Sequence, residues 1–478
     1  MKLNPLDAAW LAVESRDTPM HVGSLLVFSK PAGAGADYLQ QLMAWLRGSR
    51  DFAPPWNLKL RPGAFKRFLP VWESEPDVDL EYHLRHSALP APGGERELGM
   101  LVSRLHSHPL DFSRPLWECN LIEGLAGDRF ALYTKMHHSL VDGIGGIRML
   151  QRAMAHDPEL SDRPPPWSAH VLTDDDSAAR EPSAGGALRH LLRAARGQAA
   201  SMPEMLRALR HLYADAERAG LTAPFAAPRS VLNARITGQR RFATQQYDMA
   251  RIKALARVGE ASFNDVVLWL CATGLRRLLK ELQVLPKRSL TVGIPVNVRP
   301  AGQIAVGNAI TFILADLATA TADPRRRLER IKTSTAGAKA NLRSLPKAAL
   351  TGYTVLVMAP FILELLTGLG GRTRPIFNIT ISNVPGSPEP LYLRGARLEA
   401  MYPLSLVAHG QALNITCLSY AGTLNFGFTA CRDCLPHMQR LAVYCGEALD
   451  ELEAVLGARR VRAAKARSRG RSKPTQPR

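Results

Sequence analysis

The sequence predicts an α/β (α+β) fold with two halves, each a mixed sheet with flanking helices, joined by a polar linker. Short β-branched and aromatic runs alternate with amphipathic helical patterns in both halves. Between them, the stretch from Pro164-Pro165-Pro166 to Thr173-Asp174-Asp175-Asp176 is too polar and proline-rich to hold a packed element. At 478 residues, 46% of them hydrophobic, each half can bury a core. We expect an N-terminal domain at 1–160, a linker with a bracing helix at 161–230, and a C-terminal domain at 231–457.

The elements of the first half follow from period-2 and period-3.6 patterns. Strands are predicted at His21–Phe28, Leu116–Ile122 and Arg129–His138, and helices at Tyr38–Leu46, Leu98–Leu105 and Ile144–Ala155. Leucines and methionines at helical spacing then predict the bracing helix at Leu188–Ala219. This helix is expected to brace the two halves or to face lipid.

The second half repeats the alternation. Helices are predicted at Asn264–Leu282, Arg326–Leu342 and His437–Leu456, with strands near Thr291, Thr311, Ile379, Leu413 and Leu424. The most apolar run, Val355–Gly370, is too short to span a membrane and contains Pro360 and Glu364. It predicts a buried helix or one that lies in a membrane interface.

The net charge is +19, and nine basic side chains without an acidic one lie between Arg459 and Arg478. Residues 458–478 are therefore expected to form a basic tail without fixed structure. Nucleic acid is not the expected partner, because aromatic residues make up only 6% and do not interleave with the basic clusters. A peripheral membrane or lipid-inclusion surface, or a phosphate-bearing molecule such as coenzyme A, fits this charge better.

Six cysteines are scattered along the chain, and the first residues do not form a signal peptide. We therefore expect a reducing, cytoplasmic location, with peripheral association to the inner face of the membrane or to lipid inclusions. Cys431 and Cys434 have redox or metal spacing, but the pair stands alone. No metal and no cofactor are expected.

The chemistry is concentrated in Lys135-Met136-His137-His138-Ser139-Leu140-Val141-Asp142-Gly143, where a predicted strand turns into a predicted helix. Neighbouring side chains of a strand point to opposite faces, so His137 and His138 are not expected to share a metal ion. Asp142 has the place of a helix N-cap, and Gly143 allows a tight turn. A histidine buried beside a capping aspartate is one interpretation; a general base that deprotonates a hydroxyl near neutral pH is the other.

This His-His-x-x-x-Asp-Gly pattern resembles acyltransferases built like chloramphenicol acetyltransferase, and among them the bacterial wax ester synthase/diacylglycerol acyltransferase family most of all. The stretches that carry the resemblance are Pro5-Leu6-Asp7, Thr18-Pro19-Met20-His21-Val22-Gly23, Arg114-Pro115-Leu116-Trp117-Glu118, Asn264-Asp265-Val266-Val267, Asn297-Val298-Arg299-Pro300 and Ser382-Asn383-Val384-Pro385-Gly386. It runs from Leu3 to about Leu456. Asn4 and Trp10 stand where the family usually has serine and often has phenylalanine, and neither is expected to touch the chemistry.

The resemblance implies two chloramphenicol acetyltransferase-like domains with an active-site tunnel between them. It further implies acyl transfer from acyl-CoA to a long-chain fatty alcohol or a diacylglycerol, with His138 as base and no covalent acyl-enzyme. A carrier-protein-bound acyl donor is the alternative, although no carrier domain is fused here. A lipid-droplet coat without catalysis is a rival of another class.

Each of the remaining site residues has a functional interpretation and a purely structural one. Asn264 begins a helix and is expected to help hold the oxyanion, while Ser262-Phe263-Asn264-Asp265 is also a capping box and Asp265 is assigned to substrate binding. In related acyltransferases an arginine at the place of Arg299 pairs with the aspartate of the motif, which makes Asp142 structural. Trp117 is expected to pack or to line the acyl channel, and Ser382 and Asn383 to line the tunnel or to form a turn.

Overall fold

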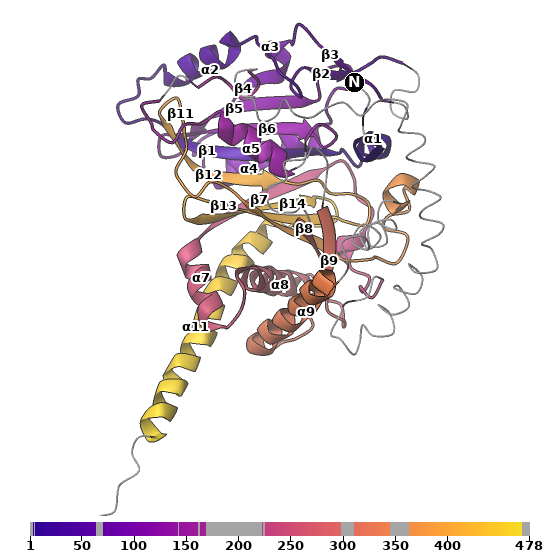
Figure 1. Ribbon diagram of the computed structural model, residues 1–478, viewed down its shortest axis with the longest axis vertical. Coiled ribbons are helices and arrows are strands. Elements are labelled where there is room, and N and C mark those ends of the chain that lie inside the picture. The colour runs from indigo at the N-terminus through magenta and orange to yellow at the C-terminus, as the bar shows by residue number, and fades with distance from the viewer. Residues whose placement is uncertain are drawn as a thin grey trace, which may run out of the picture.

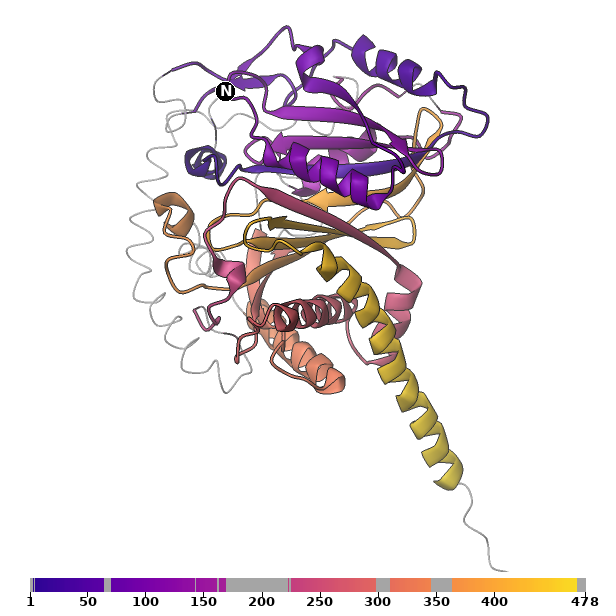
Figure 2. The ribbon, with the colours of Figure 1, turned by 180° about the vertical axis from the view of Figure 1, so that it is seen from behind.

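Two six-stranded sheets form the centre of the computed structural model, one above the other in Figures 1 and 2, and β12 of the first sheet contacts β13 and β14 of the second. The structure describes residues 3, 5–63, 70–141, 143–160, 163–168, 222, 225–297, 310–344 and 363–470. Both sheets mix parallel and antiparallel pairs, because β4 runs parallel to β5 and β10 runs parallel to both β13 and β8. The predicted mixed fold is thereby confirmed.

The first half begins with α1 and ends with α5. Its elements are α1 (Pro5–Val13), β1 (His21–Ser29), α2 (Tyr38–Gly48), β2 (Leu58–Leu60), β3 (Trp72–Ser74), α3 (Leu80–His83), β4 (Leu84–Ala88), α4 (Glu95–Ser107), β5 (Trp117–Leu125), β6 (Arg129–His137) and α5 (Gly143–Arg152). The predicted strands and helices of this half are all present. The bracing helix expected at Leu188–Ala219 lies outside the described residues.

The second half adds a short 3-10 turn (Val231–Asn233) and the elements that follow it. These are β7 (Arg240–Asp248), α7 (Met249–Val258), α8 (Phe263–Glu281), β8 (Thr291–Asn297), β9 (Ile310–Asp316), α9 (Pro324–Ser344), β10 (Ile379–Pro385), β11 (Tyr392–Leu393), β12 (Ala396–Leu404), β13 (Leu413–Tyr420), β14 (Thr423–Cys431) and α11 (Gln439–Gly470). Every strand and helix predicted for this half after Asn264 is found, apart from the run at Val355–Gly370, of which only residues 363–370 are described.

The first sheet has the order β11-β12-β1-β6-β5-β4, and the second has the order β7-β14-β13-β10-β8-β9. β11 and β12 belong by sequence to the second half, yet β12 pairs antiparallel with β1 along its length. The sheets therefore do not follow the halves that we expected at 1–160 and 231–457. The two sheets come so close that a Cβ on Gly427 of β14 would lie 1.8 Å from the carbonyl oxygen of Pro403 in β12, so only glycine fits there.

Two large apolar cores hold this arrangement. One fills the space between the second sheet and the helices α7, α8, α9 and α11. The other covers one face of the first sheet and includes residues from α2 and α5. Burying apolar surface on this scale is the main favourable term in folding.

The C-terminal helix α11 continues to Gly470, past the point where we expected a tail without fixed structure. Alanine, arginine and lysine dominate residues 458–470 and are strong helix formers, which explains why the helix propagates from its packed first turns. Its last turns project away from the body (Figures 1 and 2). Within the described part of the chain, no helix combines the length and the apolar character that crossing a bilayer requires.

Candidate active site

The corner between β6 and α5 holds the histidine doublet by backbone hydrogen bonds on two sides. The N–H of His137 donates to the Leu116 carbonyl at 2.9 Å, and the N–H of His138 donates to the Met20 carbonyl at 2.8 Å. β1 also pairs with β6, so that His21 lies opposite His137. The doublet is thus fixed between the entry to β1 and the entry to β5.

His137 faces inward. Its ring is 1% exposed, Nδ1 accepts a hydrogen bond from the Ser139 N–H at 3.1 Å, and Ser139 Oγ lies 2.6 Å from the same nitrogen. An Nδ1 that accepts carries no proton, so the ring proton belongs on Nε2. Nε2 lies 3.5 Å from the Glu14 carboxylate, which also accepts from the Met20 N–H. His137 is therefore committed to internal contacts, as expected for the face opposite to His138.

His138 is partly exposed, although its Nδ1 atom is buried. Its imidazole stacks on the indole of Trp10, with the ring centroids 4.6 Å apart and the planes inclined by 25°. Trp10 therefore contacts the residue that is predicted as the base, while its expected distance from the chemistry stays a prediction. Neither Trp10 nor Glu14 was singled out as a site residue from the sequence, and their only signal is that they stand four residues apart, one helical turn.

Asp142 and Arg299 both lie outside the described residues, so their pairing remains a prediction. Gly143 begins α5 and is exposed. A Cβ built on it would meet no atom within 4 Å.

Asn264 and Asn383 meet between the two sequence motifs that contain them. Asn383 Nδ2, near the end of β10, donates to Asn264 Oδ1 in the first turn of α8 across 2.9 Å, and both side chains are exposed. Ser382, beside Asn383 in β10, is half-buried. The contact leaves the Nδ2 atom of Asn264, at the positive end of the helix dipole, as its available donor.

Asp265 is used by the protein itself. One carboxylate oxygen accepts from the Ser262 N–H at 2.8 Å, and the Ser262 hydroxyl accepts in return from the Asp265 N–H at 3.2 Å, which completes a capping box. The other oxygen accepts from the Thr335 hydroxyl of α9 at 2.6 Å. Both oxygens are occupied, so these contacts favour the structural interpretation of Asp265 over substrate binding.

Trp117 is also internal. It is fully buried, its Nε1 donates to the Trp56 carbonyl at 2.7 Å, and its ring stacks on His83 and on Trp167. The side chain therefore packs, which was one of its two expected roles. Two of its neighbours, Trp56 and Trp167, line a cavity instead.

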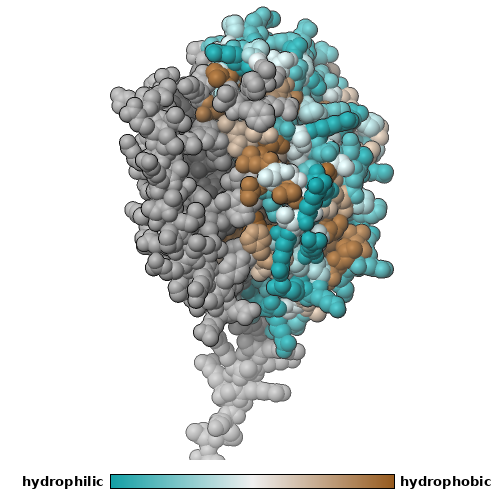
Figure 3. Space-filling model, turned by 90° about the vertical axis from the view of Figure 1, so that its right-hand side faces the viewer, coloured by the Kyte–Doolittle hydropathy of each residue, from teal (hydrophilic) through white to brown (hydrophobic). Residues whose placement is uncertain are grey.

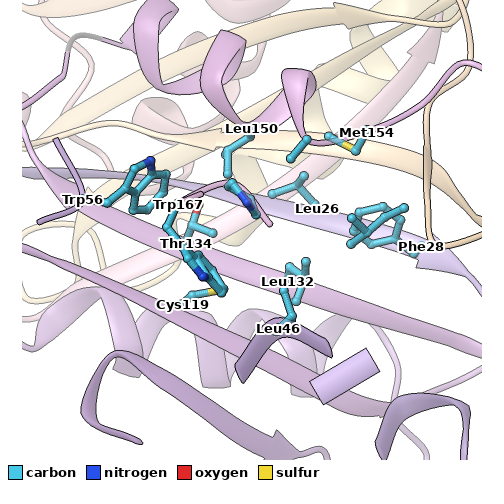
Figure 4. A pocket seen from close by; sticks show the side chains of 13 residues that line it. Leu26, Phe28, Leu46, Trp56, Cys119, Leu132, Thr134, Leu150, Met154 and Trp167 are labelled. Atoms are coloured by element: carbon cyan, nitrogen blue, oxygen red, sulfur yellow. The ribbon is translucent and has the colours of Figure 1, made fainter. Parts of the chain in front are cut away.

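That apolar cavity has a volume of about 20 Å³ and lies on the face of β6 that carries Leu132 and Thr134 (Figure 4). It is lined by Leu26, Phe28, Leu46, Trp56, Cys119, Leu132, Thr134, Leu150, Ala153, Met154, Pro166, Trp167 and Leu393. Leu132 and Thr134 have the same parity along β6, so they point to the same side, and His138 follows directly after the end of the strand.

The opposite face of β6 carries a buried polar network. Lys135 Nζ lies 3.2 Å from the Glu118 carboxylate and donates to the carbonyls of Leu105 and His108. His21 Nε2 donates to the His106 carbonyl at 2.9 Å, and His106 Nδ1 lies 2.8 Å from the Tyr133 hydroxyl. Burial lowers the pKa of His106 to about 3 and that of His21 well below its usual value, so both are neutral. These histidines support the sheet.

Cys431 and Cys434 lie together after β14, where a hydrogen bond between them lowers the pKa of Cys431 to about 5. Cys434 Sγ donates to the Arg235 carbonyl at 3.3 Å. The residues that the structure describes contain no cluster of three or more histidine, cysteine or acidic side chains that could hold a metal ion.

The chain matches the wax ester synthase/diacylglycerol acyltransferase catalytic domain over residues 3–267 and the C-terminal domain of the same family over residues 306–453. The protein belongs to that family.

Two relatives illustrate the match. A putative diacylglycerol O-acyltransferase of Mycobacterium tuberculosis strain H37Rv is 46% identical, over 96% of this chain and 98% of the relative. The O-acyltransferase WSD of Acinetobacter baylyi is 38% identical, over 95% and 97%.

Solved structures agree in fold. The wax ester synthase/diacylglycerol acyltransferase from Marinobacter aquaeolei VT8 superimposes with a TM-score of 0.76 at 38% identity, covering 96% of this chain and all of that one. The first condensation domain of the calcium-dependent antibiotic synthetase has a TM-score of 0.59 at 17% identity, covering 95% and 96%, and so shares the fold.

Proposed function

We propose that this protein transfers a long-chain acyl group from acyl-CoA to the hydroxyl of a fatty alcohol or a diacylglycerol, forming a wax ester or a triacylglycerol and releasing coenzyme A. The single observation that carries the proposal is the position of His138. It is the partly exposed member of the doublet, and it comes directly after β6, the strand whose Leu132 and Thr134 line the apolar cavity. The family membership supports the same reaction.

Because the Nδ1 atom of His138 is buried, we assign Nε2 as the nitrogen that acts on the substrate hydroxyl. In the proposed reaction Nε2 takes the hydroxyl proton while the oxygen attacks the thioester carbonyl. Asn264 Nδ2 donates to the oxyanion that forms. When the carbon–sulfur bond breaks, the imidazolium returns the proton to the leaving thiolate, and the ester and free thiol depart.

No acyl-enzyme is needed in this scheme. Ser139, the hydroxyl nearest to the doublet in sequence, is 5% exposed and bound to His137, so it is a poor nucleophile for a bulky thioester. The apolar lining of the cavity suits an acyl chain, and its volume of about 20 Å³ means that the lining side chains must move apart to admit one.

We also propose peripheral contact with an anionic lipid surface, made by a patch that we call the leucine–arginine patch. Its apolar members, Leu363, Leu366 and Leu369, are 59%, 52% and 42% exposed. Its basic members, Arg229, Arg235, Arg372 and Arg374, are exposed, and no ion pair of theirs occurs among the described residues. The side of the molecule that lies to the right in Figure 1 shows hydrophobic groups among hydrophilic ones (Figure 3). Leucines beside uncompensated arginines fit acidic head groups.

The direct test is an assay of purified protein with palmitoyl-CoA and either hexadecanol or dipalmitoylglycerol, in which thiol release and ester formation are both followed. Equal amounts of thiol and ester, dependent on the acceptor, are the expected result. Thiol release without ester would indicate a thioesterase. Transfer only from an acyl carrier protein would favour the condensation-type donor instead.

A further inference from the structure

The end of the first helix, α1, and the residue that follows it contact the two histidines of the doublet. Trp10 lies in the last turn of α1, and Glu14 comes directly after its last residue. Trp10 stacks on His138, and Glu14 lies 3.5 Å from His137 Nε2. One short segment of the chain therefore contacts both rings.

We propose that Trp10 is a positioning residue for the general base: its indole fixes the plane of the His138 ring and stabilises the imidazolium that forms during acyl transfer. This inference rests on the proposed function and adds a named residue to it. A flat ring at 4.6 Å with an interplanar angle of 25° restricts rotation of the imidazole about its χ2 bond. Fixed orientation of a catalytic group lowers the entropy lost on reaching the transition state.

Trp10 stabilises the imidazolium because the charge of the His138 ring changes during the reaction. The ring is neutral before it accepts the hydroxyl proton and cationic afterwards. A cation over the face of an aromatic ring is stabilised, and tryptophan has the strongest effect. The stabilisation is absent in the ground state, so it lowers the barrier rather than only tightening binding.

Packing alone does not account for the choice of residue. Trp10 is only partly buried, and its Nε1 is a buried donor without a hydrogen-bond partner among the described residues. A residue selected for packing would not need to bury that donor. The flat face against His138 is the contact that an aromatic ring provides and an aliphatic side chain does not.

The test compares Trp10→Leu, which keeps apolar bulk and removes the ring face, with Trp10→Phe, which keeps a ring face. In the acyl transfer assay Trp10→Leu should lower kcat roughly two- to thirtyfold, with KM for both substrates nearly unchanged. Trp10→Phe should recover most of the loss. The matched control is Trp45→Leu, because Trp45 lies on α2 and contacts Arg394 instead of a histidine; it should retain wild-type kcat.

A second measurement does not depend on the reaction. Carbethoxylation by diethyl pyrocarbonate, followed by peptide mass spectrometry, should modify His138 several times faster in Trp10→Leu than in wild type, Trp10→Phe or Trp45→Leu. His137 should stay protected in all four proteins.

An unchanged modification rate at His138 in Trp10→Leu overturns the stacking, whether or not the proposed reaction is found. Faster modification with an unchanged kcat, or a phenylalanine variant as impaired as the leucine one, overturns the role in turnover. An inactive wild type with faster modification in Trp10→Leu overturns the proposed reaction and the role in turnover, and leaves only the stacking.

Discussion

Asn383 Nδ2 donates to Asn264 Oδ1 across 2.9 Å, and this hydrogen bond ties the end of β10 to the first turn of α8. The two residues stand 119 positions apart in two separate motifs. Because an amide accepts only through its oxygen, the bond determines which way the Asn264 amide faces. Asn383 therefore orients the group that we propose as oxyanion donor.

The asparagine pair leads to a double-mutant prediction. Asn264→Ala should lower kcat by about 10²–10³, the cost of losing one oxyanion donor. Asn383→Ala should lower kcat less, because the donor remains but is no longer oriented. The double variant should be no slower than Asn264→Ala, and steady-state kinetics check this. Losses that multiply in the double variant would mean that the two residues act separately.

Glu14 and His137 should matter for stability rather than for turnover. Glu14→Leu leaves the buried Met20 N–H without its acceptor, which costs about 1–3 kcal/mol, so the free energy of unfolding should fall by an amount of that order. Glu14→Gln keeps an acceptor for the Met20 N–H and should cost less. Urea unfolding measures both. A leucine variant as stable as the glutamine variant would show that the Glu14 carboxylate does not stabilise the fold.

The course of the chain shows what sequence patterns can predict. Strands such as β1 and helices such as α8 were predicted within a few residues, because periodicity and capping are local. The pairing of β12 with β1 was not predicted, because the choice of strand partner depends on packing between residues far apart in the chain.

In the site, too, local patterns predict some features, while contacts between distant residues are seen only in the structure. Strand alternation predicts different surroundings for His137 and His138; in the structure His137 is buried and His138 is partly exposed, and β6 ends at His137. Trp10 and Glu14 lie more than 120 residues before the doublet, and no local pattern connects them to it. Trp117 was assigned to packing or to the channel, and only the structure shows its Nε1 bound to the Trp56 carbonyl.

Stability should decrease in mild acid because of buried neutral histidines. Burial lowers the pKa of His83 to about 4, that of His106 to about 3, and that of His21 in the same direction. The unfolded chain binds these protons near pH 6.5, so the contribution is complete above about pH 6.5 and declines as the pH falls toward the folded values. Each histidine should cost about 2 kcal/mol at about pH 5.

Urea unfolding at neutral pH and at about pH 5 measures this loss of stability. A free energy of unfolding that stays level between neutral pH and about pH 5 would show that these rings are not buried in the neutral form.

The leucine–arginine patch predicts a defect in lipid binding without a defect in chemistry. Replacing Leu363, Leu366 and Leu369 by serine should weaken binding to vesicles containing phosphatidylglycerol at least about tenfold, since each leucine that enters the interface contributes free energy. Turnover of detergent-dispersed substrates should be preserved. Vesicle co-sedimentation measures the binding.

The matched control replaces Met100, Leu160 and Val443, which are 56%, 60% and 56% exposed at other places, by serine. It should bind vesicles as the wild type does. Equal binding by the patch variant and the wild type would direct attention to residues 457–478, whose removal by truncation after Leu456 is the next comparison.

The most direct test of the account is acceptor-dependent thiol release by His138→Ala and His137→Ala beside the wild type, with the fold of each checked by its unfolding midpoint. We predict that His138→Ala loses about 10²–10⁴ in kcat, the range of general-base catalysis, while its unfolding midpoint stays near that of the wild type. His137→Ala should keep more activity and lose stability, because its ring is bound inside the protein. Wild-type turnover by a folded His138→Ala, or an equal loss from both variants, would contradict the assignment of His138 as the base.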